Sequence, residues 1–232
     1  DPSDDLLTIT SVTFEGAPTA AGLYTDGPFG IADGVVLATG DVTNALPPNE
    51  YGNVSTDFGL DGCEECDEII PGYTTYDAAI LTIEFDVDPA CTSIAFDFIF
   101  GSDEYPEYVG TAYNDVFGAY LNGEQIAFDG DGNPITINGP FFSGPYVEVP
   151  PANGLEYDGS TYLLQSAAEV EPGSTGNILR IVVCDAGDHI YDAGVFLSRL
   201  RGSGSDPCTG IAPQFSFSED LNCGDTLYAA PG

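Results

Sequence analysis

A period-two alternation of apolar and polar residues is the feature that most limits how this chain folds. In residues 78–88, leucine, isoleucine, phenylalanine and valine alternate with threonine and acidic residues, and residues 93–101 repeat the pattern with three phenylalanines. Alternate residues of a β-strand share one face, so this spacing predicts strands with one face buried. Similar runs predict further strands at 115–128, 177–185 and 193–200, one strand or a pair of strands at 155–170, and upstream strands in LTITSVTFEG and GVVLATG.

Turn-forming residues separate the predicted strands. The chain has 29 glycines and 17 prolines, and this density disfavours any helix longer than a turn or two. Asn122-Gly123 lies between two apolar runs, and Asn-Gly is a strong signal for a two-residue hairpin turn. We therefore predict an all-β fold: an antiparallel β-sandwich, jelly-roll-like, with roughly ten or more strands and long loops.

A domain boundary is predicted near the stretch RGSGSDPCTG at 201–210. Residues 1–201 form the predicted sandwich, and residues 202–232 form a linker and an extended C-terminal segment. That segment is too short to be a domain, which leaves three interpretations. It is the start of a following domain, a strand that another subunit receives at a sheet edge, or a tail held by a disulfide.

The net charge narrows the possible partners. With 3 basic and 38 acidic residues, the chain carries a formal charge of −35, which argues against nucleic acid and anionic membrane surfaces as partners. No apolar run of about 18 residues is present, so direct membrane insertion is not expected. High salt, bound divalent cations or a basic partner would relieve the self-repulsion. A soluble acidic surface is the alternative that needs no partner.

Six cysteines indicate an oxidising, extracellular setting. The first residues lack the basic and apolar regions of a signal peptide, so we expect any such peptide to have been removed. A four-cysteine zinc site would need a second close Cys pair, which the sequence lacks, and acids and a proline flank Cys63 and Cys66 where a redox motif would have a strand and a helix. We expect disulfides instead: a Cys91–Cys184 bridge, a local Cys208–Cys223 pair, and a small loop closed by Cys63 and Cys66.

Several long motifs, in order along the chain, resemble one family. These are PFGIADGVVLATGDVTNALPPN, TTYDAAILTIEFDV, FDFIFGSDEYPEYVGTAYNDVFGAYLNG, EYDGSTYLL and VCDAGDHIYDAGVFL. Together they resemble the choice-of-anchor L domain of secreted bacterial surface proteins, over about residues 8 to 201. The resemblance implies an exported, non-enzymatic surface module whose C-terminal anchor differs between members. It transfers no binding residues, and no anchor is visible after residue 201.

Acidic residues gather in three groups at the ends of predicted strands. The first group is Asp103, Glu104 and Glu107, with Asn114 and Asp115 close behind; the second is Asp185, Asp188 and Asp192; the third is Asp129, Asp131 and Asn133. If the first two groups meet at one end of the sandwich, they form an acidic rim whose repulsion a cation would relieve. Ca²⁺ takes six to eight oxygen ligands in irregular geometry, so we predict bound Ca²⁺ there.

The third group, DGDGN, resembles the start of an EF-hand loop but lacks the later acid and the flanking helices. It is therefore either a loop calcium site or an ordinary Asp/Gly turn. For all three groups the alternative is that Asp and Asn side chains cap turns by accepting backbone hydrogen bonds, which needs no cation.

Catalysis is not expected. Acid pairs that would suit glycoside hydrolysis are too common in this chain to be informative, and Trp and the G-x-S-x-G motif are absent. His189 is the only histidine, and Asp188 precedes it. Neighbours in a strand face opposite sides, which argues against a catalytic triad built on this pair.

Two functional classes remain. The first is a calcium-stabilised surface module that mediates adhesion or binds a cell-surface glycan or protein, with Tyr105, Tyr108 and Tyr113 as contact residues. The second is a structural subunit of an extracellular fibre or surface layer, assembled from copies of itself by edge-strand or tail exchange. Both are secreted and neither is an enzyme.

Overall fold

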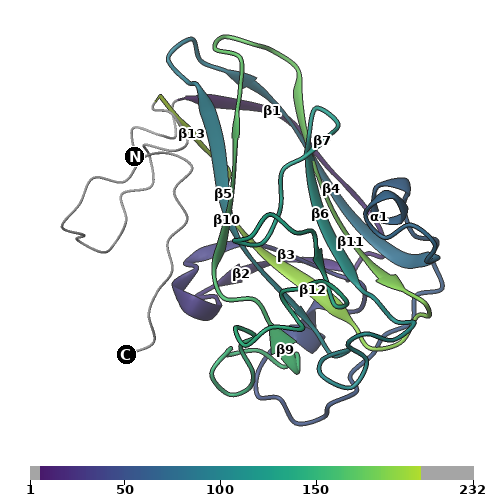
Figure 1. Cartoon of the computed structure of the whole chain (residues 1–232). Helices are drawn as coiled ribbons and strands as arrows, with labels where there is room; N and C mark the ends of the chain where they lie inside the picture. The colour runs from purple at the N-terminus through teal and green to yellow at the C-terminus, as the bar shows by residue number, and fades with distance from the viewer. Residues whose placement is uncertain (1–5, 205–232) are drawn as a thin grey trace.

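Two antiparallel β-sheets pack face to face in the computed structural model, which describes residues 6–204 (Figure 1). The strands are β1 (Leu7–Glu15), β2 (Ala21–Thr25), β3 (Asp33–Ala38), β4 (Thr75–Val87), β5 (Ser93–Ser102), β6 (Val116–Leu121), β7 (Glu124–Gln125), β8 (Ile135–Thr136), β9 (Gly159–Ser160), β10 (Leu164–Glu169), β11 (Asn177–Ala186), β12 (Ala193–Ser198) and β13 (Arg201–Ser203). The helices are η1 (Pro28–Gly30), η2 (Val42–Ala45) and α1 (Glu64–Ile69).

Successive long strands alternate between the sheets. The six-stranded sheet has the order β1-β4-β11-β6-β7, with β8 also on β6, and the seven-stranded sheet has the order β10-β5-β12-β3-β2, with β9 and β13 also on β5. From β3 to β6 and from β10 to β12, each strand therefore lies in the sheet opposite its predecessor. This arrangement confirms the predicted antiparallel, jelly-roll-like β-sandwich.

The main core lies between the sheets and is built from the alternating positions. Phe96, Phe98 and Phe100 of β5 are all buried, and the ring centroid of Phe98 lies 4.9 Å from that of Phe117 on the opposite sheet. Strand β6 is buried on both faces, as is the second half of β11, because α1 covers their outer side, where Tyr120 and Val182 pack with Cys66 of α1. Figure 1 shows α1 on that outer side.

Turn chemistry explains the hairpin that was predicted from Asn122-Gly123. Tyr120 pairs with Gln125 and Leu121 with Glu124, so the two turn residues lie between paired strands. Asn122 has φ of 51° and Gly123 has φ of 88°, the positive values that a type I′ turn requires and that Asn and Gly tolerate best. The prediction of a hairpin is confirmed.

Helices are short, as the Gly and Pro content predicts. The α-helix has six residues and the 3-10 helices have three and four, and no helix within residues 6–204 is long and apolar enough to cross a membrane. The stretch 155–170, predicted to hold one strand or a pair of strands, holds a pair. Residues 159–160 and 164–169 both pair with β5, and residues 155–158 before them form a loop. The predicted division at residue 201 stays a prediction.

Candidate functional site

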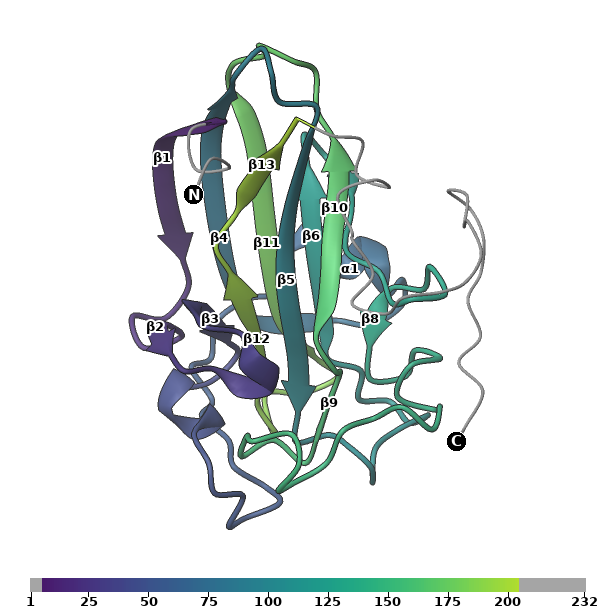
Figure 2. The same cartoon turned by 90° about the vertical axis from the view of Figure 1, so that its left-hand side faces the viewer.

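Four strand ends bring the first two acidic groups together. β5 and β11 end where β6 and β12 begin, at the end of the sandwich that holds β9 and lies at the bottom of Figure 2. There the Asp115 carboxylate accepts a hydrogen bond from the Ala186 amide at 3.3 Å, and the Asp103 amide donates to the Asp192 carbonyl at 3.2 Å. The predicted meeting of the two segments is present in the structure.

These acids are buried and do not form an exposed rim. We define the acidic cluster by its buried carboxyl groups, which are Asp103, Glu104, Asp115, Glu156, Asp185 and Asp192. Five of the six residues are at most 1% exposed and Glu156 is 5% exposed. Asn114 is buried beside them, Asp188 is half-buried, and Glu107 is exposed.

Several carboxylate oxygens of the acidic cluster have no hydrogen-bond partner among the described residues. They are Oδ2 of Asp103, Oε2 of Glu104, both oxygens of Glu156 and both oxygens of Asp185. A buried polar atom left without a partner costs about 1–3 kcal/mol, and more if it is charged. The cluster therefore needs either protons or a cation to balance it.

Two members of the cluster are satisfied by the protein. Asp192 accepts from the Asn44 side chain and from the Thr56 amide, both at 2.8 Å, and Asp115 accepts from the Ser102 hydroxyl at 2.8 Å. Asp192 and Asp115 thus accept hydrogen bonds from backbone amides, as expected if they cap turns without a cation. The unpartnered oxygens of Asp103, Glu104, Glu156 and Asp185 are not explained by turn capping.

Burial and mutual repulsion raise the pKa of these carboxyl groups. Burial, followed by the charge of Glu156, raises the pKa of Asp103 to about 9. Burial, followed by the charge of Asp115, raises the pKa of Glu104 to about 9. For Glu156 burial is again the main cause, and its pKa rises to about 7. Burial also raises the pKa of Asp185 well above its ordinary range.

The ion pairs of Arg180 and Arg201 do not neutralise the negative charge of the acidic cluster. Arg180 binds Glu65 and Glu15, and Arg201 binds Asp97, all outside the acidic cluster. The buried hydroxyl of Tyr157 is also without a partner in the described part of the chain. The acidic cluster is thus a set of hard oxygen donors, the chemistry that Ca²⁺ prefers.

The spacing of these donors is wider than one compact coordination shell. Within residues 6–204, two groups of acidic, His or Cys residues place three ligand atoms within 4.8 Å of one another: Cys63, Cys66 and Cys184, and Asp57, Asp77 and His189. Neither group belongs to the acidic cluster. A cation in the acidic cluster would therefore need water, backbone carbonyls or small side-chain shifts to complete its shell.

The DGDGN loop has the geometry of a self-contained turn. Oδ1 of Asp129 accepts the backbone N–H groups of Asp131 at 2.9 Å and Asn133 at 2.8 Å. This pattern is the turn alternative left open by the sequence. Asp131 is exposed.

The tyrosines predicted to contact a partner divide into two kinds. Tyr108 lies against Tyr113 and Tyr191, with both pairs of ring centroids 5.1 Å apart. We call these three residues the tyrosine cluster; they are half-buried and adjoin the acidic end. Tyr105 instead packs against Phe142 and the main core.

Sequence reasoning missed Glu156, Asp77 and Tyr157. Glu156 belongs to the stretch 155–170, for which the sequence predicts a strand or a pair of strands, although Pro150 and Pro151 precede it. Asp77 has φ of 46°, is buried, and accepts hydrogen bonds from the amides of Leu60 and Phe58. A carboxylate within an apolar strand pattern was the available signal for Asp77.

The only histidine extends this network. Nδ1 of His189 lies 3.3 Å from an Asp77 oxygen and 3.5 Å from an Asp57 oxygen, and its ring lies 4.0 Å from that of Tyr76 between centroids. The ring is held by packing and by two acids.

The cysteine predictions are wrong where the structure describes the residues. Cys184 lies with Cys63 and Cys66 under α1, whereas Cys91 lies in the main core between the sheets. All four are free thiols, so neither a Cys91–Cys184 bridge nor a Cys63–Cys66 disulfide is present. Hydrogen bonds from Cys184 and Cys66 lower the pKa of Cys63 to about 4. The predicted Cys208–Cys223 pair lies outside the described residues.

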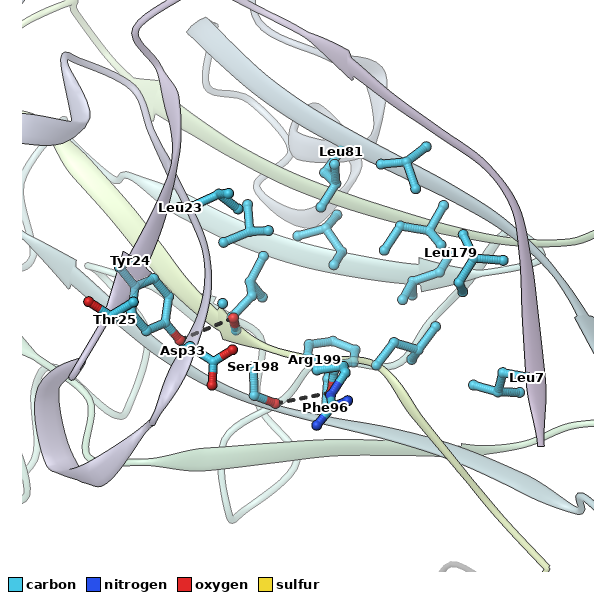
Figure 3. Close-up of a pocket in the computed structure, with 18 residues that line it drawn as sticks. Leu7, Leu23, Tyr24, Thr25, Asp33, Leu81, Phe96, Leu179, Ser198 and Arg199 are labelled. Carbon is cyan, nitrogen blue, oxygen red and sulfur yellow. Dashed lines mark hydrogen bonds between the residues drawn. The ribbon is translucent and has the colours of Figure 1, made fainter. Parts of the chain in front are cut away.

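An apolar cleft opens on the side of the sandwich away from α1. It has a volume of about 640 Å³ and lies between the edge strands β1 and β2. Figure 3 shows Leu23, Leu81, Phe96 and Leu179 among the residues that line it, with Arg199 and other polar groups along another side. The cleft is separate from the acidic cluster.

Comparison with known proteins identifies the family. No curated protein matches the chain. Solved structures to which the chain is similar include a carbohydrate-binding module that recognises mannan (TM-score 0.34, 15% identity, covering 84% of this chain and 96% of that one) and a carbohydrate-binding module specific for non-crystalline cellulose (TM-score 0.37, 13% identity, covering 83% of this chain and 88% of that one). The family model for the choice-of-anchor L domain matches residues 4–201. The chain therefore belongs to the choice-of-anchor L domain family.

Proposed function

We propose that this chain is a non-enzymatic surface module whose acidic cluster binds Ca²⁺ and depends on it for full stability. The observation that carries the proposal is the set of unpartnered oxygens on Asp103, Glu104, Glu156 and Asp185. Membership of a family of secreted surface proteins supports an extracellular setting. Millimolar calcium is a natural partner for weak oxygen sites of extracellular modules.

Calcium suits this cluster better than magnesium. Mg²⁺ demands near-ideal octahedral geometry and keeps its waters, whereas Ca²⁺ accepts irregular shells that include water and backbone carbonyls. A cation among the more widely spaced oxygens of the acidic cluster would need such water and carbonyl ligands. The charges of Glu104 and Asp115 repel each other, as do those of Asp103 and Glu156, and a divalent ion near either pair would replace repulsion with attraction.

The tyrosine cluster gives the module a contact surface beside the cation. Tyrosine offers a rigid ring and a polar hydroxyl, which suit stacking on a sugar ring or packing on a protein. We propose that Tyr108 and Tyr113 contact a cell-surface glycan or protein and that Tyr191 supports them through its contact with Tyr108.

Calorimetric titration with CaCl₂ tests the calcium site. We expect saturable binding by the wild-type chain that MgCl₂ does not compete away at equal concentration. Glu104→Gln and Asp103→Asn should each weaken the affinity at least tenfold, while Asp131→Asn, on the exposed loop, should leave it unchanged. Equal binding by all of these variants would place calcium elsewhere.

A second candidate function is assembly into a fibre or layer, and the apolar cleft favours it. Its edges are the outermost strands β1 and β2, and Leu23 at its border is 88% exposed. Leu200 lines the cleft, and β13 follows it directly in the chain. The segment 205–232 therefore begins five residues after a residue of the cleft lining. We propose residues 205–232 of a second copy as the occupant.

Removal of residues 204–232 tests the assembly proposal. If assembly uses this segment, the truncated chain should sediment as a monomer at concentrations where the full chain forms dimers or polymers. Assembly that persists after truncation would remove this candidate. A full chain that is monomeric at every concentration would also contradict it.

A further inference from the structure

Three thiols that lie far apart in the sequence converge under α1. The Sγ atoms of Cys63, Cys66 and Cys184 all lie within 4.8 Å of one another, and those of Cys63 and Cys184 are 3.5 Å apart. Cys63 caps the N-terminus of α1, Cys66 lies in its first turn, and Cys184 comes from β11. A CxxC pair is thereby completed by a third cysteine on another element.

The sulfur spacing suits a shared metal ion better than a disulfide. A disulfide holds its two sulfur atoms about 2.05 Å apart, far closer than the 3.5 Å between Cys63 and Cys184. Two thiolates bound to one Zn²⁺ at about 2.3 Å in tetrahedral geometry lie roughly 3.8 Å apart. The observed distance is close to the second value.

The surroundings of one of the three sulfur atoms, Sγ of Cys63, suit a thiolate. The backbone N–H of Cys66 donates to Sγ of Cys63 at 3.4 Å, which stabilises negative charge on that sulfur. Cys66 and Cys184 are fully buried among apolar residues that include Ile70, Ala78 and Val182, while Cys63 is half-buried. The partial exposure of Cys63 gives a metal ion a way in.

We propose that Cys63, Cys66 and Cys184 together bind one thiophilic metal ion, with Zn²⁺ as the ion to test. Each thiol that becomes a ligand releases its proton on binding. No fourth acidic, His or Cys ligand joins the three within the part of the chain that the structure describes, which leaves a coordination position for water. The ion would fasten α1 to β11 on the outer side of the six-stranded sheet.

The test measures zinc on the full chain and on four variants. The chain is produced with ZnCl₂ present and without added reductant or chelator, and its zinc content is measured by native mass spectrometry. Affinity is then measured by competition with a chromophoric chelator. Cys63→Ser is the central variant, because serine is a good N-cap and should preserve the start of α1. Cys184→Ser removes the ligand contributed by β11.

Two control variants remove thiols from outside this site. Cys91→Ser deletes a thiol that is equally buried but lies in the main core, and a Cys208→Ser/Cys223→Ser double variant removes the two thiols of the C-terminal segment. A melting curve in chelator shows whether each variant is folded before its zinc content is compared.

We expect one zinc per chain in the wild type and in both controls. Cys63→Ser and Cys184→Ser should bind zinc at least tenfold more weakly, with Cys63→Ser retaining its melting temperature in chelator. Zinc content unchanged by Cys63→Ser, or no zinc in the wild type, would overturn the proposal. Peptide mapping that finds any two of these three cysteines joined as a disulfide in the isolated wild-type chain would also overturn it.

Discussion

Cys184 and Asp185 are consecutive residues of β11 whose side chains belong to two different clusters on opposite faces of the six-stranded sheet. The Cys184 thiol packs under α1 with Cys63 and Cys66, and the Asp185 carboxylate is buried near Asp115 and Asp192. The alternation of side chains along a strand separates them. One strand end thus connects the proposed zinc site to the proposed calcium site.

Asp185→Asn should raise the melting temperature in chelator and reduce the gain that calcium gives. Both oxygens of Asp185 lack partners among the described residues, so replacing the carboxyl with a neutral amide removes a group that is costly to ionise. We expect an increase of a few degrees without calcium and a smaller calcium-dependent shift than in the wild type. A variant less stable than the wild type in chelator, with an undiminished calcium shift, would identify Asp185 as a structural residue only.

Stability in chelator should fall as the pH rises from about 5 to 9. Asp103 and Glu104 have folded-state pKa values of about 9 and Glu156 of about 7, all above their values in an unfolded chain. The folded chain therefore holds more protons than the unfolded chain in this window, and raising the pH removes that stabilisation. Each such group contributes up to about 1.4 kcal/mol per pH unit. Urea unfolding at several pH values measures the slope.

Calcium should flatten this pH profile at its alkaline end, because a bound cation replaces the protons. A chain whose stability in chelator rises between pH 5 and 9 would show that these carboxylates are already ionised and satisfied in the folded state. Glu104→Gln provides the control, since it should reduce the slope without calcium.

Tyr108→Ala should weaken partner binding without a large loss of stability. Tyr108 is half-buried and contacts Tyr113 and Tyr191 at ring distances of 5.1 Å, so its removal opens the centre of the tyrosine cluster. Loss of a ring that stacks on a ligand costs about 1–2 kcal/mol, or roughly tenfold in affinity. A glycan array supplies the ligands to be compared. Equal binding by wild type and Tyr108→Ala would place the contact surface elsewhere.

Leu23→Glu should block assembly through the cleft while leaving the monomer intact. Leu23 is almost fully exposed, so the fold gains little from it, whereas a charge at the border of the cleft would be desolvated by any occupant. Sedimentation velocity should show monomers for Leu23→Glu and larger species for Leu46→Glu, which is an exposed leucine that does not line the cleft. Assembly by both variants would exclude the cleft as the interface.

The strands could be predicted because their signal is local. Phe96, Phe98 and Phe100 alternate within one short run, and Asn122-Gly123 carries its turn geometry in its own residue types. The meeting of Asp115 with Ala186 could be predicted only conditionally, since it depends on which strand ends share one end of the sandwich.

The missed residues depend on long-range pairing. Glu156 enters the acidic cluster from a loop, and no periodic pattern announces it. Cys184 lies closer to Cys63 than to Cys91 because β11 pairs with β4 and β6 beneath α1. The spacing of the cysteines in the sequence does not indicate which of them lies beside Cys184.

Thermal unfolding of the full chain in chelator, then in millimolar CaCl₂, MgCl₂ or NaCl of matched ionic strength, tests the central claim most directly. A site occupied at 100 times its dissociation constant adds about 2.7 kcal/mol to the free energy of unfolding, a shift of several degrees. The calcium site predicts a rise in melting temperature with CaCl₂ that clearly exceeds the rise with MgCl₂ or NaCl. Equal rises with all three salts, or none with any of them, would contradict it.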